Sequence, residues 1–523
     1  MMKTRWNIII MAMFAAAGFP GCRHMPIANV PITQTRQFFI NNEGNDSSYG
    51  DMNHPWQTID RLNKEKFKPG DTIYFKGGQV FEGTIILDST DIGAEGLPIV
   101  ICSYGIAKAV IASGPAPAMT LNGARFIQIE NLGFSGSGRK KGSRSNGVEV
   151  INGNDIIIDQ LDIQGFQKSG LMVYCSSGIR ITNVSAHDNG FAGIFITGNI
   201  SKTDCRNIYI GYCKAENNPG DPTNFDNHSG NGILAGFCSN TIIEYSSATN
   251  NGWDMPRKGN GPVGIWAFEA DSVIIQHCIS YRNKTSSGSA DGGGFDLDGG
   301  VTNSVVQYCL SYENQGSGYG IFQYAGASKW FNNTFRFNIS VNDGYPAVDA
   351  GVLIWNSSGD SLQFYDSYFY NNTIYNEKGS AIRYDTSSKH FAFRFFNNIF
   401  IGKKEILKGK GNASAFTSNN WWSIENGFNI DNIHTINEWN SLKNMEMSNG
   451  RFTAFNINPG FPAQAKAFIT DPADLTGFNQ FAIQSDSPLS QDGIDLYKTF
   501  GWSVGDININ GHPLLPGAIG ASY

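Results

Sequence analysis

The sequence predicts an all-β fold, a right-handed parallel β-helix whose N-terminal end is closed by a short helix. The first observation is a repeated unit from about residue 147 onward: a glycine-started strand, a turn, a second apolar strand and a closing asparagine. The second is composition, because 61 glycines, 13% aromatic residues and only 16% charged residues fit short strands and turns rather than disorder. Since stacked coils supply one another with hydrogen-bond partners and a continuous core, such a repeat indicates a solenoid.

The repeat is most regular in its second strands and in the residues that close each unit. The second strands are expected at 179–182, 208–211, 241–244, 272–276 and 304–307. The closing asparagines are Asn189, Asn217, Asn250, Asn283, Asn314 and Asn342, at intervals of 28, 33, 33, 31 and 28 residues. Fixed strands and variable loops account for these unequal intervals, and we expect the asparagines to form an internal ladder that satisfies turn amides.

The first 22 residues are typical of a bacterial export signal. Lys3 and Arg5 precede an apolar stretch at 6–17, which is too short to span a bilayer as a helix. Residues 19–22 resemble a lipoprotein cleavage box, which implies that Cys22 is acylated and becomes the new N-terminus. The predicted location is the periplasm or the outer membrane, with a lipid anchor at Cys22 as the only membrane contact. Ordinary secretion is the alternative.

Three parts are expected after this leader. Residues 35–76 form an N-terminal cap and the first coil, and an amphipathic helix near 55–64 covers the open end, where strand edges would otherwise be unpaired. Residues 77–410 form the β-helix. The pattern becomes irregular in residues 411–523, which form the last coils and a C-terminal cap.

Both ends of the mature chain resemble those of bacterial β-helix polysaccharide lyases and glycosidases. The resemblance rests on the segments 38–46, 55–62 and 69–75 at the start, and on 486–495 and 516–521 at the end. It implies the fold and a carbohydrate-active function but identifies no substrate.

Charge and cysteine content indicate what the protein does not bind and how its thiols behave. The net charge is −7 and no basic stripe is present, so we do not expect the protein to bind nucleic acid. Cys213, Cys278 and Cys309 recur at the same place in the repeat, so stacked buried thiols are a better interpretation than disulfides.

The first strand of each coil predicts a groove. Side chains alternate along a strand, so placing Ile265, Phe295 and Ile321 in the core turns their neighbours outward. One outward column would contain Phe195, Leu234, Trp266, Asp296, Phe322, Leu353 and Arg383, and the next Thr197, Gly236, Phe268, Asp298, Tyr324, Trp355 and Asp385. Aromatic faces stack on sugar rings and carboxylates perform acid–base chemistry, so this face predicts a carbohydrate site. The substrate-binding residues expected on it are Trp266, Phe268, Phe322, Tyr324, Trp355 and Arg383.

Long loops precede these strands at 219–231, 253–262 and 284–294. Long loops on one side of a rigid scaffold are a common place for function. They are expected to bring further residues to the same face, namely His228, Asp254 and Lys258 as substrate ligands, with Asp226, Arg257 and Asp291 beside them.

The densest signal is the glycine-flanked segment 290–300, which contains Asp291, Asp296 and Asp298. Asp296 and Asp298 are expected about 6–7 Å apart on one face, given about 3.3 Å per strand residue. Paired carboxylates can hydrolyse a glycosidic bond without a metal or cofactor. Alternatively, Asp291, Asp296 and Asp298 could bind Ca²⁺ through their oxygens.

The spacing of Asp291 and Asp298, seven residues apart on loop and strand, resembles that of the β-helix lacto-N-biosidases. This resemblance implies Asp291 as general acid/base, Asp298 as nucleophile and Asp296 as an assisting group. The segment resembles calcium-dependent β-helix pectate lyases more weakly. Those enzymes use a lysine on a neighbouring coil, whereas the next coil here, 320–324, has none and Lys329 lies beyond the strand.

The sequence is therefore compatible with three functions, each with an oligo- or polysaccharide as partner. A glycoside hydrolase is preferred, because a lyase needs positive charge to hold a uronate and Arg383 is the one evident outward cation. The alternatives are a Ca²⁺-dependent polysaccharide lyase acting on an acidic glycan, and a non-catalytic glycan-binding surface protein.

Overall fold

The structure is a computed structural model that describes residues 35–385, 389–409, 413–442, 445–462, 467–502 and 504–523. The predicted export signal and Cys22 lie outside these residues. Among the helices that are described, none has both the length and the apolar character needed to cross a membrane.

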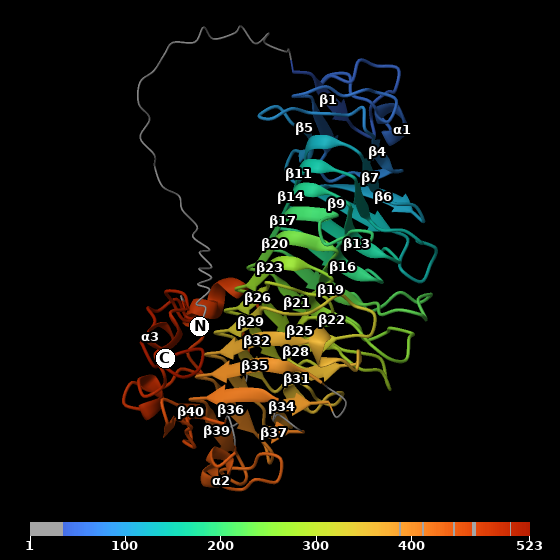
Figure 1. Cartoon of the computed structure of the whole chain (residues 1–523). Coiled ribbons are helices and arrows are strands. Elements are labelled where there is room, and N and C mark those ends of the chain that lie inside the picture. Colours follow the sequence, from blue (N-terminus) through green and yellow to red (C-terminus); the bar gives the residue numbers. More distant parts are fainter. Residues whose placement is uncertain (1–34, 386–388, 410–412, 443–444, 463–466, 503) are drawn as a thin grey trace, which may run out of the picture. The chain divides into compact units, whose positions relative to one another are not determined.

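Three parallel sheets make up the fold, and each coil between the first and the last contributes one strand to each sheet (Figure 1). The 14-stranded sheet contains β1 Gln37–Ile40, β2 Thr72–Lys76, β5 Ile99–Tyr104, β8 Arg125–Glu130, β11 Asn154–Asp159, β14 Ser177–Thr182, β17 Cys205–Gly211, β20 Cys238–Glu244, β23 Asp271–Gln276, β26 Val305–Gln307, β29 Asn333–Arg336, β32 Tyr365–Tyr370, β35 Phe391–Phe396 and β38 Ser414–Thr417. The 12-stranded sheet contains β4 Ile85–Leu87, β7 Met119–Asn122, β10 Val148–Ile151, β13 Ser169–Tyr174, β16 Ala192–Thr197, β19 Asn231–Gly236, β22 Val263–Phe268, β25 Gly293–Leu297, β28 Tyr319–Gln323, β31 Ala350–Asn356, β34 Ser380–Tyr384 and β37 Leu407–Lys408. The 13-stranded sheet contains β3 Val80–Glu82, β6 Ala109–Gly114, β9 Leu132–Gly136, β12 Asp162–Gln164, β15 Ser185–His187, β18 Lys214–Glu216, β21 Ser247–Thr249, β24 Ile279–Tyr281, β27 Leu310–Tyr312, β30 Ile339–Val341, β33 Thr373–Tyr375, β36 Ile399–Gly402 and β39 Asn420–Ser423. The predicted parallel β-helix is confirmed.

Helices are few and short. The α-helices are α1 Ile59–Leu62, α2 Ile436–Asn440 and α3 Leu496–Phe500, and the 3₁₀ helices are η1 Ser361–Gln363, η2 Pro472–Gly477 and η3 Pro488–Ser490. The strands β40 Met447–Ser448 and β41 Arg451–Phe452 form an antiparallel hairpin. Helix α1 lies in the segment predicted to hold the capping helix, with Ile59 and Leu62 buried in the core. Beside it, Trp56 forms a parallel bridge with Ile40, so the outer edge of β1 is paired.

One left-handed residue per coil makes the corner between the 14- and 13-stranded sheets. Tyr212, Tyr245, His277 and Tyr308 take this position with φ between 46° and 58°. A left-handed backbone costs about 1–2 kcal/mol for such residues. Stacking of each ring on the next, with centroids 4.9–5.2 Å apart, offsets that cost.

The buried asparagine ladder exists, but three of its members are the residue after the one predicted. Its order is Asn189, Asn218, Asn251, Asn283, Asn314 and Asp343, and the side-chain oxygen of each accepts the backbone N–H of the one before it. Asn217, Asn250 and Asn342 instead take left-handed backbone conformations, with φ of 51–55°. Alternation of faces along the chain explains the difference, since a shift of one residue turns a side chain from the core to the surface.

The ladder ends in a carboxyl group, Asp343. Its Oδ1 accepts the Asn314 side-chain N–H at 2.8 Å and its Oδ2 accepts the Ser340 hydroxyl at 2.7 Å. Burial raises the pKa of Asp343 from its ordinary 3.8 to about 6. Below pH 3.8 the folded and unfolded chains both hold the proton, and between 3.8 and 6 only the folded chain does. Stability from this group is therefore lost as the pH rises through that window.

Asp343→Asn is expected to raise the free energy of unfolding at pH 8 by about 2–3 kcal/mol, because the amide keeps the Oδ1 acceptor and never ionises. At pH 4 the variant and the wild type should unfold alike. Thermal unfolding at both pH values measures this, with the exposed Asp226→Asn as control for the same change in net charge. Equal unfolding of wild type and Asp343→Asn at pH 8 would contradict the buried-carboxylate penalty.

The seven cysteines in the described residues are all free thiols. Cys213, Cys278 and Cys309 are fully buried, and burial raises the pKa of Cys213 to about 12. The stacked-thiol interpretation is confirmed.

Residues after 466 cover the outer face of the later strands of the 13-stranded sheet. Leu475, Phe481 and Leu489 pack there against Tyr312 and Ile399. The long loops before β19, β22 and β25 lead instead into the 12-stranded sheet.

Candidate active site

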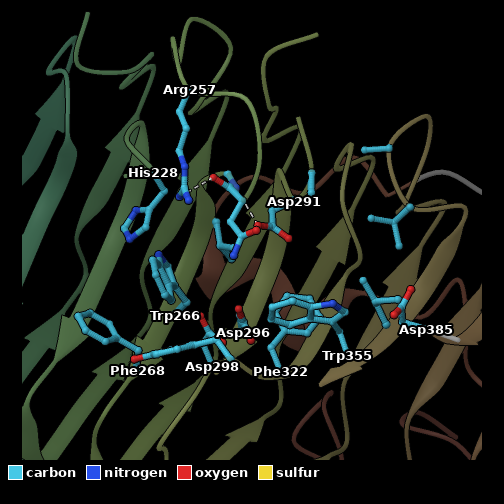
Figure 2. A pocket seen from close by; sticks show the side chains of 18 of the residues that line it. His228, Arg257, Trp266, Phe268, Asp291, Asp296, Asp298, Phe322, Trp355 and Asp385 are labelled. Carbon is cyan, nitrogen blue, oxygen red and sulfur yellow. Dashed lines mark hydrogen bonds between the residues drawn. The ribbon is translucent and has the colours of Figure 1, made fainter. Parts of the chain in front are cut away.

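A pocket of about 550 Å³ lies on the outer face of the 12-stranded sheet, over β22, β25, β28 and β31 (Figure 2). Its floor is formed by strand residues, and its upper wall by the loops before β19, β22 and β25. The residues that line it and bear on its chemistry are His228, Arg257, Trp266, Phe268, Asp291, Asp296, Asp298, Phe322, Tyr324, Trp355, Arg383 and Asp385.

The predicted column register is wrong by two residues at β28. Asp296 pairs with Gly320, and Phe322 pairs with Trp355 on β31. The two outward columns are therefore Trp266, Asp296, Gly320, Leu353 and Arg383, and Phe268, Asp298, Phe322, Trp355 and Asp385. A shift of two keeps every side chain on its face, so face alternation could not reveal it.

Gly320 makes room beside the carboxylates. A Cβ at this position would lie 2.8 Å from the Phe322 ring and 3.0 Å from Cγ of Asp296. The ring of Phe322 and the carboxyl group of Asp296 therefore lie over the same glycine, and Asp296 is only 2% exposed.

Asp291 projects into the pocket from a loop. It has φ of 60°, and its Oδ2 accepts the backbone N–H of Gly261 at 2.8 Å. Burial raises the pKa of Asp291 to about 6, while the Gly261 N–H and the Arg257 charge act in the opposite direction. The group is thus poised to hold or release a proton near neutral pH.

Asp298 directly follows β25, and its Oδ1 accepts the backbone N–H of Gly299 at 2.7 Å. Burial raises the pKa of Asp298 to about 7, with the charges of Asp291 and Glu269 acting in the same direction. Asp296 is deeper, and burial followed by repulsion from Asp298 raises its pKa well above 3.8. Its Oδ1 has no hydrogen-bond partner among the described atoms. Of the two strand aspartates, Asp296 therefore holds its proton to higher pH.

The aromatic walls flank this acidic centre. On one side the ring centroids of Trp266 and Phe268 are 5.6 Å apart, and on the other the rings of Phe322 and Trp355 pack edge-to-face with centroids 6.1 Å apart. Tyr324 lies over Gly299 at the floor. Arg383 lines the far end and donates to the Val348 carbonyl at 2.7 Å. Flat apolar rings around carboxyl groups suit a sugar ring.

The structure brings together ten of the twelve residues predicted for catalysis or substrate binding. Asp254 and Lys258 do not line the pocket. The Asp254 carboxylate forms ion pairs with Arg139 and, at 2.6 Å, with Lys140. The Lys258 ammonium donates to the Ser287 carbonyl.

Two residues, Arg257 in the pocket lining and Asn231 buried behind it, had no assigned role in the sequence-based prediction. Arg257 supplies the cation of the upper wall, and its charge acts on both Asp291 and His228. Asn231 is fully buried and contacts both Trp266 and His228 through its side chain. The sequence indicated Arg257 as a cation on a long loop near the groove, whereas nothing in it distinguished Asn231 from the other asparagines.

The alternative in which Asp291, Asp296 and Asp298 bind Ca²⁺ stays a prediction. Within the part of the chain that the structure describes, no three His, Cys, Asp or Glu side chains are grouped so that they could hold a metal ion.

The family model described as "Pel9A-like, right handed beta helix region" matches residues 38–350, more than half of the chain. No curated protein matches the chain. Among solved structures, the GH136 lacto-N-biosidase from Eubacterium ramulus is 16% identical with a TM-score of 0.50, covering 76% of this chain and 68% of that one. Pectate lyase Pel9A is 14% identical with a TM-score of 0.42, covering 94% and 98%. At such identities the likeness concerns the fold. The resemblance and the right-handed β-helix expected from the sequence are confirmed.

Proposed function

Because the chain belongs to the Pel9A-like right-handed β-helix family, we propose that it is a carbohydrate-active enzyme that hydrolyses a glycosidic bond in the pocket of Figure 2. The observation that carries this proposal is the placement of Asp291 and Asp298 in one aromatic-lined cavity, each with a pKa raised toward neutrality. Paired carboxyl groups of this kind are the machinery of glycoside hydrolysis.

The roles follow from the surroundings of each group. Asp291, on the loop wall, protonates the leaving oxygen and later takes a proton from water. Asp298, on the floor, attacks the anomeric carbon as the carboxylate, and the Gly299 N–H at 2.7 Å stabilises its charge. Asp296 stays protonated behind Phe322 and limits the negative charge on the floor.

A polysaccharide lyase is the second candidate, because the guanidinium groups of Arg257 and Arg383 both line the pocket. Two cations could hold the carboxylate of an acidic glycan. The neighbours of the strand aspartates favour the hydrolase, since β28 presents Gly320 and Phe322 to them and not a basic side chain.

A glycan panel scored for two products distinguishes these functions. We expect new reducing ends without the ultraviolet absorbance of an unsaturated sugar, and full activity after EDTA treatment. Unsaturated products that disappear with EDTA would establish the lyase instead. Glycans that bind without any cleavage would support a non-catalytic binding protein.

We also propose that the protein is exported and lipid-anchored at Cys22. Mass spectrometry of the N-terminal peptide from bacterial membranes would detect the acylated cysteine. A Cys22→Ser variant should leave the membrane fraction.

A further inference from the structure

The side chain of Asn231 fixes the orientation of two pocket residues at once. Its oxygen accepts the Trp266 indole N–H at 3.1 Å and the Val263 backbone N–H at 3.4 Å. Its amide nitrogen lies 3.1 Å from the Phe191 carbonyl and 3.0 Å from Nδ1 of His228. An indole N–H and a backbone N–H can only donate, and a carbonyl can only accept. The amide of Asn231 therefore has one orientation that satisfies all four contacts.

This orientation determines where the proton of His228 lies. The Asn231 amide nitrogen is a donor, so Nδ1 of His228 must accept and is unprotonated. The proton of the neutral ring is then on Nε2, the nitrogen for which the described residues provide no hydrogen-bond partner in the structure. His228 lines the same pocket as Asp291, and its ring packs against Trp266 at 4.9 Å and Phe191 at 5.7 Å.

The surroundings keep the ring neutral. Burial is the main cause that lowers the pKa of His228 to about 4, and the nearby Arg257 charge acts in the same direction. The groups packed on its other sides, Phe191 and Trp266, carry no charge, and the Asn231 contact is the one opposing influence. Between pH 5 and 8 the ring therefore serves neither as a proton donor in catalysis nor as a cation.

We propose that His228 is a substrate-positioning residue, whose Nε2–H donates a hydrogen bond to an uncharged oxygen, a ring hydroxyl or carbonyl, of a sugar in the pocket. The role deepens the proposed function, because it concerns the same pocket. A neutral donor recognises an uncharged polar group of a sugar. Asn231 supports this role, since its amide nitrogen fixes the proton position of His228 and its oxygen holds the buried Trp266 indole that packs against the His228 ring.

The proton position is testable without any ligand. Two-bond ¹H–¹⁵N spectra of ¹⁵N-histidine-labelled protein, with the His228 signal identified by its loss in His228→Gln, should show the neutral Nε2–H tautomer at every pH from 5 to 8. Asn231→Asp replaces the donor with an acceptor and should move the proton to Nδ1, while the other histidine signals stay in place. A wild-type His228 that is charged at pH 6, or that holds its proton on Nδ1, overturns the proposal.

The donor role is tested by binding to a glycan array, with Asp298→Asn as the background so that cleavage plays no part. His228→Ala is expected to weaken binding of the best glycan about 10-fold, and His228→Gln, which retains an N–H donor, about 3-fold or less. An array on which the background protein and His228→Ala behave alike contradicts the donor role. Absence of cleavage by the wild-type enzyme would contradict the proposed hydrolase alone, since these measurements use no turnover.

Discussion

Asp298→Asn is expected to lower kcat/KM on the cleaved glycan by about 10³-fold or more while the β-helix stays folded. The amide cannot attack the anomeric carbon, so the covalent step is lost. The fold should not suffer, because the asparagine oxygen still accepts the Gly299 N–H that Asp298 accepts at 2.7 Å. Removing a buried group whose pKa is raised to about 7 should even increase thermal stability at pH 8. A large loss of activity with no loss of stability is the signature of a catalytic group.

Steady-state kinetics and thermal unfolding at pH 8 measure the two effects together. Asp226→Asn, exposed on the loop before β19, makes the same chemical change outside the pocket and should keep wild-type activity. Full turnover by Asp298→Asn would show that Asp298 is not the nucleophile, whatever its position in the pocket.

The fold could be predicted from the sequence because each coil repeats the same local pattern of inward aliphatic residues and turn glycines or asparagines. The pairing between coils could not be derived in the same way. Tyr319 shows why, since it points into the core and its hydroxyl donates to the carbonyls of Cys309 and Ile339 at 2.8 and 3.0 Å. With Tyr319 and Ile321 both suited to the inside, face alternation allowed two registers for β28, and the wrong one paired Asp296 with Phe322 and not with Gly320.

The strand residues of the site were predictable, and so were His228 and Asp291, whereas the loop residues Asp254 and Lys258 were placed wrongly. Asp296, Asp298 and Trp355 occupy fixed places on the outer face of the sheet. Asp254 lies in a loop, and its contacts with Arg139 depend on a segment 115 residues away in the chain. No pattern local to either residue contains that information. The role of Asn231 likewise depends on contacts with Phe191, 40 residues earlier.

Asp291→Asn is expected to lower kcat/KM on the natural glycan about 10²–10³-fold and to change the pH profile. In the wild type the acid form of Asp291, with a pKa of about 6, must protonate the leaving oxygen. Asp298, with a pKa of about 7, must be ionised at the same time, so activity should fall about 10-fold per pH unit only above about pH 7. The variant should lose this alkaline limb, because its amide does not titrate.

The leaving group separates this role from that of Asp298. A nitrophenyl glycoside of the cleaved sugar needs no proton on its leaving oxygen, so Asp291→Asn should form the glycosyl-enzyme about as fast as the wild type does and release a burst of nitrophenol. Asp298→Asn should show no burst on the same compound, because it lacks the nucleophile. Loss of the burst in both variants would indicate that Asp291 orients the sugar or the floor carboxylate rather than transferring a proton. The matched pair thus assigns the two carboxyl groups by their chemistry, independently of how far each variant lowers the overall rate.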